Sequence, residues 1–246
     1  MDNKQILDTL KLAREHSKKR NFSQSIDLII NLKGINIKKP EENINIFTIL
    51  PHSRGKESKI GALIGKELIS LTRSIVDMAI EHDEFPKFQQ DPKKLKKVAK
   101  SIDYFIAQAN LMPDVAKYFG KVLGPMGKMP NPKIGSIIPP TIPDLKPIVE
   151  KFKKTVRLQT KNEPVIKCAV ATESMKDESI AENIMTIYNN VLHSLKDEKR
   201  NIKNVIIKFS MGRPFIIGKP YTQEELKEVQ KIKKSKYKEK SKKNSK

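Results

Sequence analysis

The residues that most often catalyse reactions or bind metals are few in this sequence and stand far apart. Its four histidines are His16, His52, His82 and His193, and no two of them have the spacing of a metal-binding pair. Cys168 is the only cysteine and lies in the apolar run VIKCAVA, where a buried, inert thiol is expected. The motifs GxSxG, HExxH and Walker A do not occur. The sequence therefore gives no evidence of catalytic residues, a metal site or a cofactor.

One segment has a composition suited to holding a phosphate backbone. GKVLGPMGKMPNPKIG, residues 120–135, combines glycine, which allows close backbone approach, with proline, which fixes φ, and with lysine. We expect a stiff, irregular loop with exposed amides and cationic tips, able to hold a nucleic-acid backbone. Composition fits a connector packed between domains equally well. The residues in question are Gly124, Pro125, Gly127, Lys128, Pro130, Asn131, Pro132 and Lys133.

The charge of the chain also indicates a polyanionic partner. Of 246 residues, 49 are Lys or Arg and 28 are Asp or Glu, a net charge of +21. Residues 231–246 contain nine lysines and one glutamate, so we expect a largely disordered basic tail over 221–246. The tail would bind nucleic-acid phosphates without sequence specificity; the alternative is that it only increases the solubility of the protein. Residues 59–155 carry +7, while 1–58 and 156–230 carry only +4 and +2.

Several protein classes are excluded by composition. A single cysteine rules out an intrachain disulfide and with it a disulfide-stapled secreted fold. No run of 18 apolar residues occurs, and the N-terminus lacks the apolar core of a signal peptide, so we expect a soluble, intracellular protein with no membrane partner. The hydrophobic content of 37% suffices for a packed core, and the length suits one large domain or two ordinary ones.

Apolar periodicity predicts the elements that must position these residues. We expect strands 156–160 and 164–172 to pair through a turn at 161–163, and Gly120 to end the helix that begins at Met112. We also expect Pro147 to interrupt a basic helix over 142–155. The other expected helices are 4–17, 92–102 and 177–195, and the other expected strands are 25–32, 44–50, 59–65, 103–109 and 201–210.

The order of these elements predicts two domains. Strands and helices alternate in the middle of the chain, as in an α/β domain, whereas both flanks have α+β content. We therefore expect a discontinuous α+β outer domain, residues 1–58 and 156–220, with an α/β domain inserted at 59–155 and the tail following at 221–246.

Several segments together resemble one known family. LGPMGKMPNPK closely resembles the signature of the large-subunit ribosomal protein family numbered one, which forms the mobile stalk beside the tRNA exit site. Further stretches agree in order along the chain from about Lys4 to Lys219, and the first of them resembles the archaeal branch. These stretches are RNFSQSIDLIINL, ILPHSRGK, DYFIAQANLMP, ESMKDESIAENI and KFSMGRP.

The resemblance implies both a fold and a partner. It implies that the inserted domain is Rossmann-like with three layers, and that the outer domain binds a stem–loop region of large-subunit rRNA. The RNA-binding residues carried over are Phe22, Gln24, Ser25, Lys167, Ser210, Met211, Gly212 and Arg213. Phe22 would supply an apolar plate, the serines would bond 2′-hydroxyls, and Gly212 would let the backbone approach RNA. Considered alone, Phe22 would more simply be a core residue.

The family also implies a cellular role. Its members are ribosome-bound in the cytoplasm, move with exit-site tRNA as it leaves, and often bind their own mRNA to repress its translation. Three residues depart from the family pattern. Met126 replaces an arginine, so that Lys128 would have to bind the phosphate instead; Lys167 stands where relatives often have histidine; Arg213 replaces a proline.

Two other functions stand beside that of an rRNA-binding structural protein. A ribosome-assembly factor of the same fold would bind precursor rRNA, but such factors tend to lose motifs that are nearly intact here. An enzyme using a nucleotide in the α/β domain should show GxGxxG after a strand and an acidic ribose partner, and neither is clear.

Overall fold

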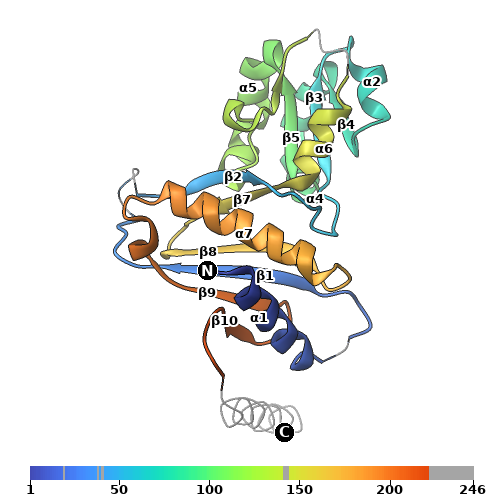
Figure 1. Ribbon diagram of the computed structural model, residues 1–246. Coiled ribbons are helices and arrows are strands. Elements are labelled where there is room, and N and C mark those ends of the chain that lie inside the picture. The colour runs from blue at the N-terminus through green and yellow to red at the C-terminus, as the bar shows by residue number, and fades with distance from the viewer. Residues whose placement is uncertain (19, 38, 40–41, 141–143, 222–246) are drawn as a thin grey trace, which may run out of the picture.

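The computed structural model describes residues 1–18, 20–37, 39, 42–140 and 144–221. The predicted tail, from residue 222 onward, and the first two residues of the expected helix 142–155 lie outside this described part. Two bodies of secondary structure are joined by a pair of strands, β2 (Asn45–Ile49) and β7 (Thr155–Gln159) (Figure 1). One is built from both ends of the described chain and the other from its middle.

The first body is a four-stranded antiparallel sheet covered on one face by two helices. Its strands are β1 (Ser25–Leu32), β8 (Val165–Thr172), β9 (Ile202–Phe209) and β10 (Pro214–Ile216), in the order β10-β9-β1-β8. Helices α1 (Asn3–Glu15) and α7 (Asp177–Ser194) pack on it. Burial alternates along β1, so the even-numbered side chains form the core and the odd-numbered ones face the opposite, open side.

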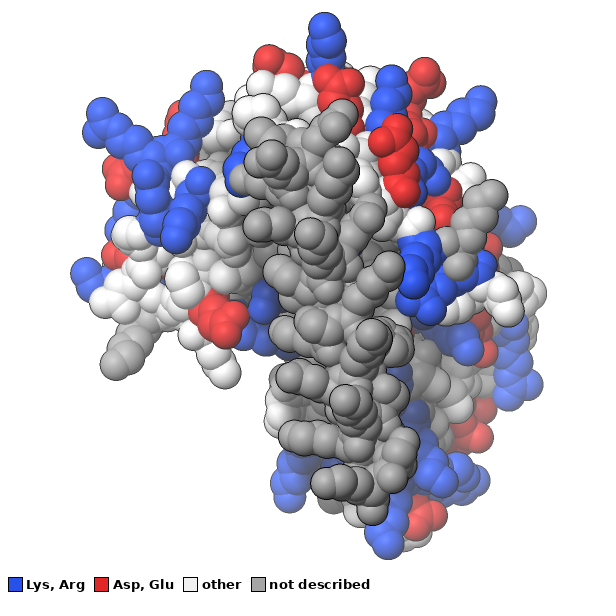
Figure 2. Space-filling model, turned by 90° about the horizontal axis from the view of Figure 1, so that it is seen from below, with Lys and Arg blue, Asp and Glu red and all other residues white. Residues whose placement is uncertain are grey.

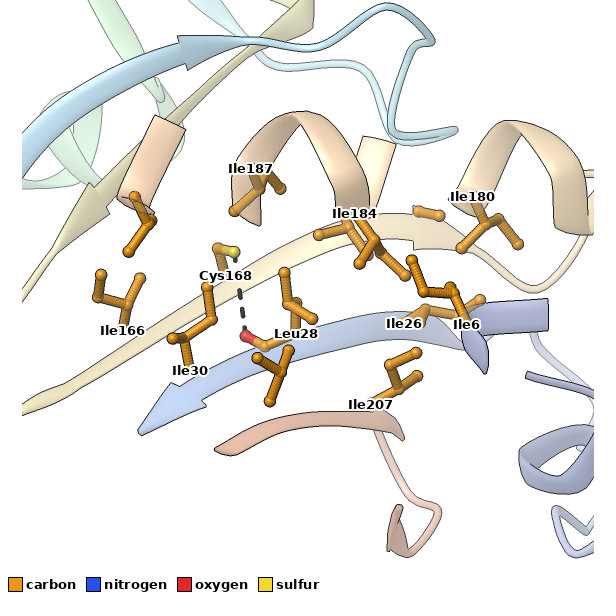
Figure 3. Close-up of a cluster of buried hydrophobic side chains, with 14 of the residues drawn as sticks. Ile6, Ile26, Leu28, Ile30, Ile166, Cys168, Ile180, Ile184, Ile187 and Ile207 are labelled. Atoms are coloured by element: carbon orange, nitrogen blue, oxygen red, sulfur yellow. Dashed lines mark hydrogen bonds between the residues drawn. The ribbon is translucent and has the colours of Figure 1, made fainter. Parts of the chain in front are cut away.

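The core of this body is a dense aliphatic layer between sheet and helices (Figure 3). Isoleucines from α7 point down onto β8 and β1, as the four-residue spacing of Ile180 and Ile184 requires. Cys168 belongs to this layer, where burial raises the pKa of its thiol to about 12. The expectation of a buried thiol is therefore confirmed.

The two joining strands correct one prediction. Strand β7 (Thr155–Gln159) pairs with β2 (Asn45–Ile49), while β8 pairs with β1, so strands 156–160 and 164–172 do not form a hairpin. The turn signal at 161–163 is local, whereas each strand pairs with a strand far away in the sequence. Backbone bonds extend both ladders, from Thr160 N to Ile44 O (3.0 Å) and from Leu32 N to Pro164 O (2.8 Å).

The second body is a three-layer α/β unit around a wholly parallel sheet. Its strands are β3 (Ile60–Ile64), β4 (Met78–Glu81), β5 (Tyr104–Gln108) and β6 (Ile137–Ile138), in the order β4-β3-β5-β6. Helices α3 (Phe85–Gln90), α4 (Pro92–Ser101) and α5 (Met112–Met126) pack on one face, and α2 (Ile69–Arg73) and α6 (Lys146–Lys154) on the other.

The combination of α+β and three-layer α/β architecture confirms the predicted fold class. The boundaries at 58/59 and 155/156, and the end at 220, stay a prediction. Short 3₁₀ segments at His82–Glu84, Ala109–Leu111, Pro132–Ile134 and Glu198–Asn201 complete the described elements.

Two helix predictions were wrong at their ends. Helix α5 continues past Gly120, because the apolar stripe extends to Leu123, and it ends at Gly127, whose φ of 65° is left-handed. Pro147 does not interrupt α6 but lies in its first turn, where a backbone donor is not needed.

Candidate nucleic-acid interface

Most of the predicted RNA-binding residues converge at one end of the outer sheet. Ile26 of β1 pairs with Phe209 of β9, so the segment before β1 lies beside the turn after β9. Ser210 N donates to Ser25 O at 2.9 Å and joins the two segments directly. The structure therefore brings together Phe22, Gln24, Ser25, Ser210, Met211, Gly212 and Arg213.

Two large apolar side chains are exposed at this end. Phe22 is 55% exposed and Met211 57% exposed, and Ile49, elsewhere on β2, is the third such residue within the described ranges. The simpler interpretation of Phe22 as a core residue is therefore wrong. Exposed apolar side chains on a fixed backbone are suited to contact a partner, because covering them removes apolar surface from water.

Gln24 is buried and connects the segments around this end of the sheet through hydrogen bonds. Its side chain is 1% exposed and donates to Ser17 Oγ (3.3 Å) and Lys18 O (3.4 Å), while Oε1 accepts from Met211 N at 3.4 Å. Its carbonyl accepts from Glu173 N at 2.8 Å. The buried side chain of Gln24 therefore positions the exposed residues around it and is not itself accessible to a binding partner.

The turn after β9 is shaped by a close contact at Gly212. Its N–H donates to Phe209 O at 2.7 Å, and a Cβ at this position would lie 2.8 Å from Phe209 Cβ. Glycine is therefore needed for packing within the turn as well as for any approach of RNA. Arg213 follows; its Nη1 is buried without a hydrogen-bond partner in the described chain, and burial lowers the pKa of its guanidinium.

Lys167 lies away from this cluster, on the open face of the sheet. It pairs with Ile29 on β1, four residues beyond Ser25, and its Nζ lies 3.3 Å from Glu163 Oε2. The same face carries Asp27 opposite Lys208. Desolvation raises the pKa of Asp27, and Lys208 partly counters that effect.

Charge on the molecule's surface is mixed rather than gathered in one block. Figure 2 shows lysines and arginines around the lower end, with acidic residues between them.

Arg14 was not predicted from the sequence, yet it connects helix α1 to the segment before α7 next to the cluster. Its guanidinium donates to Asp177 Oδ1 (2.8 Å), Glu173 O (2.9 Å) and Met175 O (3.1 Å), and lies 6.0 Å from the ring centroid of Phe209. No motif marks this arginine, because its hydrogen-bond partners lie on segments that are distant in the sequence.

The signature segment of the inserted domain is an ordered connector. Pro125 lies in the last turn of α5, Pro130 is buried, and Pro132 opens a 3₁₀ turn in which Asn131 Oδ1 accepts from Lys133 N at 3.0 Å. Gly124 and Lys133 are exposed. Pro125, Gly127 and Pro132 are exposed as well, so the segment is ordered and lies mostly at the surface.

Lys128 does not have the role expected for it. Its Nζ donates to Ala99 O at 2.8 Å and to Ile102 O, so it caps the end of α4, and burial lowers the pKa of its ammonium. An ammonium engaged in this way is not placed to bind a phosphate in place of the arginine that Met126 replaces.

The described residues show no cluster suited to catalysis or metal binding. No group of three or more His, Cys, Asp or Glu could hold a metal ion there. His52 pairs with Glu182 (2.6 Å), and His82 pairs with Asp114 (2.9 Å) and, at 3.9 Å, with Asp83. None of the helices within the described ranges has the length and apolarity needed to cross a membrane. Fold and surface together define a mixed α/β and α+β protein whose exposed chemistry suits binding.

Comparison with known proteins identifies the family. Residues 13–213 match the profile described as "Ribosomal protein L1p/L10e family". The chain is 42% identical over 211 residues to the large ribosomal subunit protein uL1 of Pyrococcus abyssi, covering 86% of this chain and 94% of that one. It is 40% identical over 219 residues to uL1 of Methanothermococcus thermolithotrophicus (89% and 100%) and 38% identical over 211 residues to uL1 of Thermococcus kodakarensis (86% and 95%).

The chain therefore belongs to the ribosomal protein L1p/L10e family, whose members are structural ribosomal proteins and not enzymes. This confirms the family resemblance, its archaeal form and the prediction that the chain is not an enzyme.

Proposed function

We propose that this chain is a structural constituent of the large ribosomal subunit and binds a stem–loop region of its rRNA through the end of the outer sheet. The observation that carries this proposal is the joint exposure of Phe22 and Met211 on a base fixed by the buried Gln24. The relatives' name, large ribosomal subunit protein, supports the ribosomal part of the proposal.

The chemistry of this end suits folded RNA. Folded RNA is recognised mainly through its shape, its 2′-hydroxyls and bases that are not stacked in a duplex. Phe22 and Met211 offer apolar surfaces against a base or ribose, and the hydroxyls of Ser25 and Ser210 both donate and accept. Arg213 has a guanidinium nitrogen without a partner in the described chain, so a phosphate oxygen would satisfy it.

We assign Gln24 and Gly212 supporting roles in this interface. Gln24 keeps Met211 in register with the segment before β1, and Gly212 permits the tight turn over Phe209. Lys167, on the open face, adds a cation that a strand of RNA crossing the sheet would meet. Specificity then comes from shape and a few neutral groups.

General affinity would come from the more basic parts of the sequence. Residues 59–155 carry +7 and residues 231–246 carry +8, against +6 in residues 1–58 and 156–230 together. Phosphate contacts by lysine release counterions and depend little on base sequence. Removal of residues 231–246 should therefore weaken every RNA complex by a similar factor, and a weakening confined to the stem–loop would contradict this division.

The domain boundaries are part of the same proposal. A chain that joins residues 1–58 directly to 156–220 should fold and keep its preference for the stem–loop, because every buried residue of the outer core lies in those segments and only the partly buried Tyr221 is lost from its edge. Loss of the preference in a folded chain of this kind would show that the inserted domain contributes to specificity.

The family role extends further. As part of a cytoplasmic ribosome, the protein would move with exit-site tRNA and assist its release, and would repress its own mRNA if that mRNA contains a similar stem–loop. The first of these is testable by measuring tRNA release from ribosomes that lack the protein. The second requires a binding assay with the leader of its own mRNA.

Binding to an rRNA stem–loop and to an arbitrary duplex of equal length tests the central claim. At ~150 mM salt, the physiological range, we expect clear preference for the stem–loop and an affinity that falls as salt rises. Equal affinity for the two RNAs would refute a specific site. Retention on mature large subunits after a high-salt wash distinguishes a constituent of the subunit from an assembly factor bound to precursor rRNA.

A further inference from the structure

A cavity of about 220 Å³ lies where the joining strands meet the inserted domain. Phe47 and Arg157 line it from β2 and β7, and Tyr104 and Lys128 line it from the inserted domain. Arg54, in the segment that connects β2 to β3, also lines the cavity. Part of the signature segment, residues 126–129 with Ile134, also lines it, whereas the outer-sheet cluster does not.

The cavity wall has an excess of positive charge. Arg54, Lys128 and Arg157 line it with Asp103 as the only acidic residue. Asp103 Oδ2 accepts from Lys59 N at 3.2 Å. An anion entering the cavity would therefore meet more cationic than anionic groups.

Arg54 differs from the other two cations in having a buried N–H group without a partner within the described ranges. Lys128 donates to backbone carbonyls that end α4, and Arg157 donates to Gly127 O at 2.6 Å. Arg54 Nη2 contacts Ser58 Oγ, but its Nε is buried and has no partner in the described part of the chain. Buried guanidinium donors are normally satisfied, so this one points to an acceptor supplied from elsewhere.

Two further hollows share lining residues in sequence between the cavity and the open face of the outer sheet. A hollow on that face is lined by Asp27, Lys167 and Lys208. Lys167 also lines the next hollow, over β7, which shares Arg157 with the cavity. The cavity and these two hollows are each lined by cationic side chains together with one acidic residue, Asp103, Glu163 or Asp27.

We propose that this cavity binds one phosphate group of an RNA strand that continues from the open sheet face, with Arg54 as its principal donor. The inference rests on the proposed rRNA binding for the source of the phosphate, but the phosphate site itself stands on the cavity and Arg54. A guanidinium suits a phosphate because its planar donors match two phosphate oxygens.

The size of the cavity restricts the ligand. Sites for drug-sized ligands measure roughly 300–1,000 Å³, so 220 Å³ suits one phosphate with its attached sugar rather than a dinucleotide. The neighbouring ring of Phe47 is already covered by Arg157, whose guanidinium carbon lies 5.4 Å from the ring centroid. A stacked base is therefore not part of the proposal.

The phosphate site is tested on the full chain by titration with inorganic phosphate and with uridine 5′-monophosphate. The NMR signal of the Arg54 Nε–H group, assigned by its absence in Arg54→Gln, should move in a saturable way. The signal of Arg73, which is exposed on α2, should not move. A stationary Arg54 signal with both probes and with RNA would overturn the proposal; the otherwise unchanged spectrum of Arg54→Gln shows that this variant folds and that the assignment holds.

The source of the phosphate is tested with two RNAs. One is the stem–loop alone, and the other carries a single-stranded extension of about six nucleotides, within the ~4–16 that single-strand sites cover. The extension should raise affinity about tenfold, as expected for a charged hydrogen bond. Arg54→Gln should abolish that increase and reduce the salt slope by about 0.7, whereas Arg73→Gln, with the same charge change, should keep the increase.

The outcomes separate the possible failures. A moving Arg54 signal with no increase in affinity from the extension would support a site for free phosphate or mononucleotide and overturn the RNA source. An increase that survives Arg54→Gln would overturn the assignment of Arg54. Failure of the unextended stem–loop to bind would refute the proposed function. The phosphate titration would still show whether the cavity binds phosphate.

Discussion

Replacement of Phe22 by alanine should separate RNA recognition from stability. The side chain is 55% exposed before β1, so its removal leaves no cavity in the core. The change is also neutral, so it alters no phosphate contact. We therefore expect a loss of specific binding with little effect on folding.

The magnitude follows from the exposed surface. A phenylalanine buries roughly 150–250 Å² when fully covered, so about 100 Å² of Phe22 remains for a partner. At ~25 cal/mol per Å² this corresponds to at most about 2.5 kcal/mol, and stacking of one base typically contributes ~1–3 kcal/mol. We expect a loss of about 2 kcal/mol, which is about a 30-fold weaker complex.

Fluorescence anisotropy with a labelled stem–loop, repeated over a range of salt concentrations, measures this loss. The plot of log affinity against log salt should shift downward without a change in slope, since the number of phosphate contacts is unchanged. Ile49→Ala is the matched control, because Ile49 is 48% exposed on β2, away from the cluster. It should bind RNA like the parent chain.

Three results would refute the reasoning. A lower slope would mean that Phe22 acts by positioning cations. An equal loss for an arbitrary duplex would mean that it contributes to affinity and not to specificity. A fall in thermal midpoint well beyond that of Ile49→Ala would mean that Phe22 supports the fold despite its exposure.

Three further predictions concern the framework of the site. Arg14→Ala should lower the free energy of unfolding in urea by about 2 kcal/mol, because it removes charged hydrogen bonds to Asp177 and to two backbone carbonyls; an unchanged urea midpoint would contradict this. Gly127→Ala should cost about 2 kcal/mol in the same assay, since φ of 65° is left-handed, whereas the helical Gly124→Ala, with open space around it, should be neutral or slightly stabilising. Burial raises the pKa of the Cys168 thiol from 9.0 to about 12, so the folded form stays protonated while the unfolded form ionises, and stability is lost as pH rises above about 9. Between pH 8 and pH 10 the parent chain should lose about 1.4 kcal/mol more than Cys168→Ala, and equal losses would show that the thiol is not protected.

Local patterns in the sequence predicted most individual elements. The alternation of Ile26, Leu28 and Ile30 indicated β1, and the helical spacing of Ile180 and Ile184 indicated α7, because each pattern reflects the burial of one face. Alternation of strands and helices in the middle of the chain likewise indicated the parallel sheet. These features depend on neighbouring residues alone.

Pairing and helix length were less accessible to sequence reasoning. β7 pairs with β2, a strand from the distant first part of the chain, and a turn signal carries no information about such a partner. Gly120 resembles a helix end, yet Phe119 and Leu123 bury one stripe that carries α5 on to Gly127. Tertiary packing overrode the local signal in both cases.

The sequence by itself determined the class of the protein, its family and the residues of the candidate interface, because these depend on composition and on motifs in a fixed order. Tertiary structure decided what each residue does there. Gln24 is buried and supports its neighbours through hydrogen bonds, whereas Phe22 is exposed. The ammonium of Lys128 donates to a backbone carbonyl at the end of α4. Only folding brings Arg54 to a cavity between the joining strands and the inserted domain, since exposure and hydrogen-bond partners are set by residues far apart along the chain.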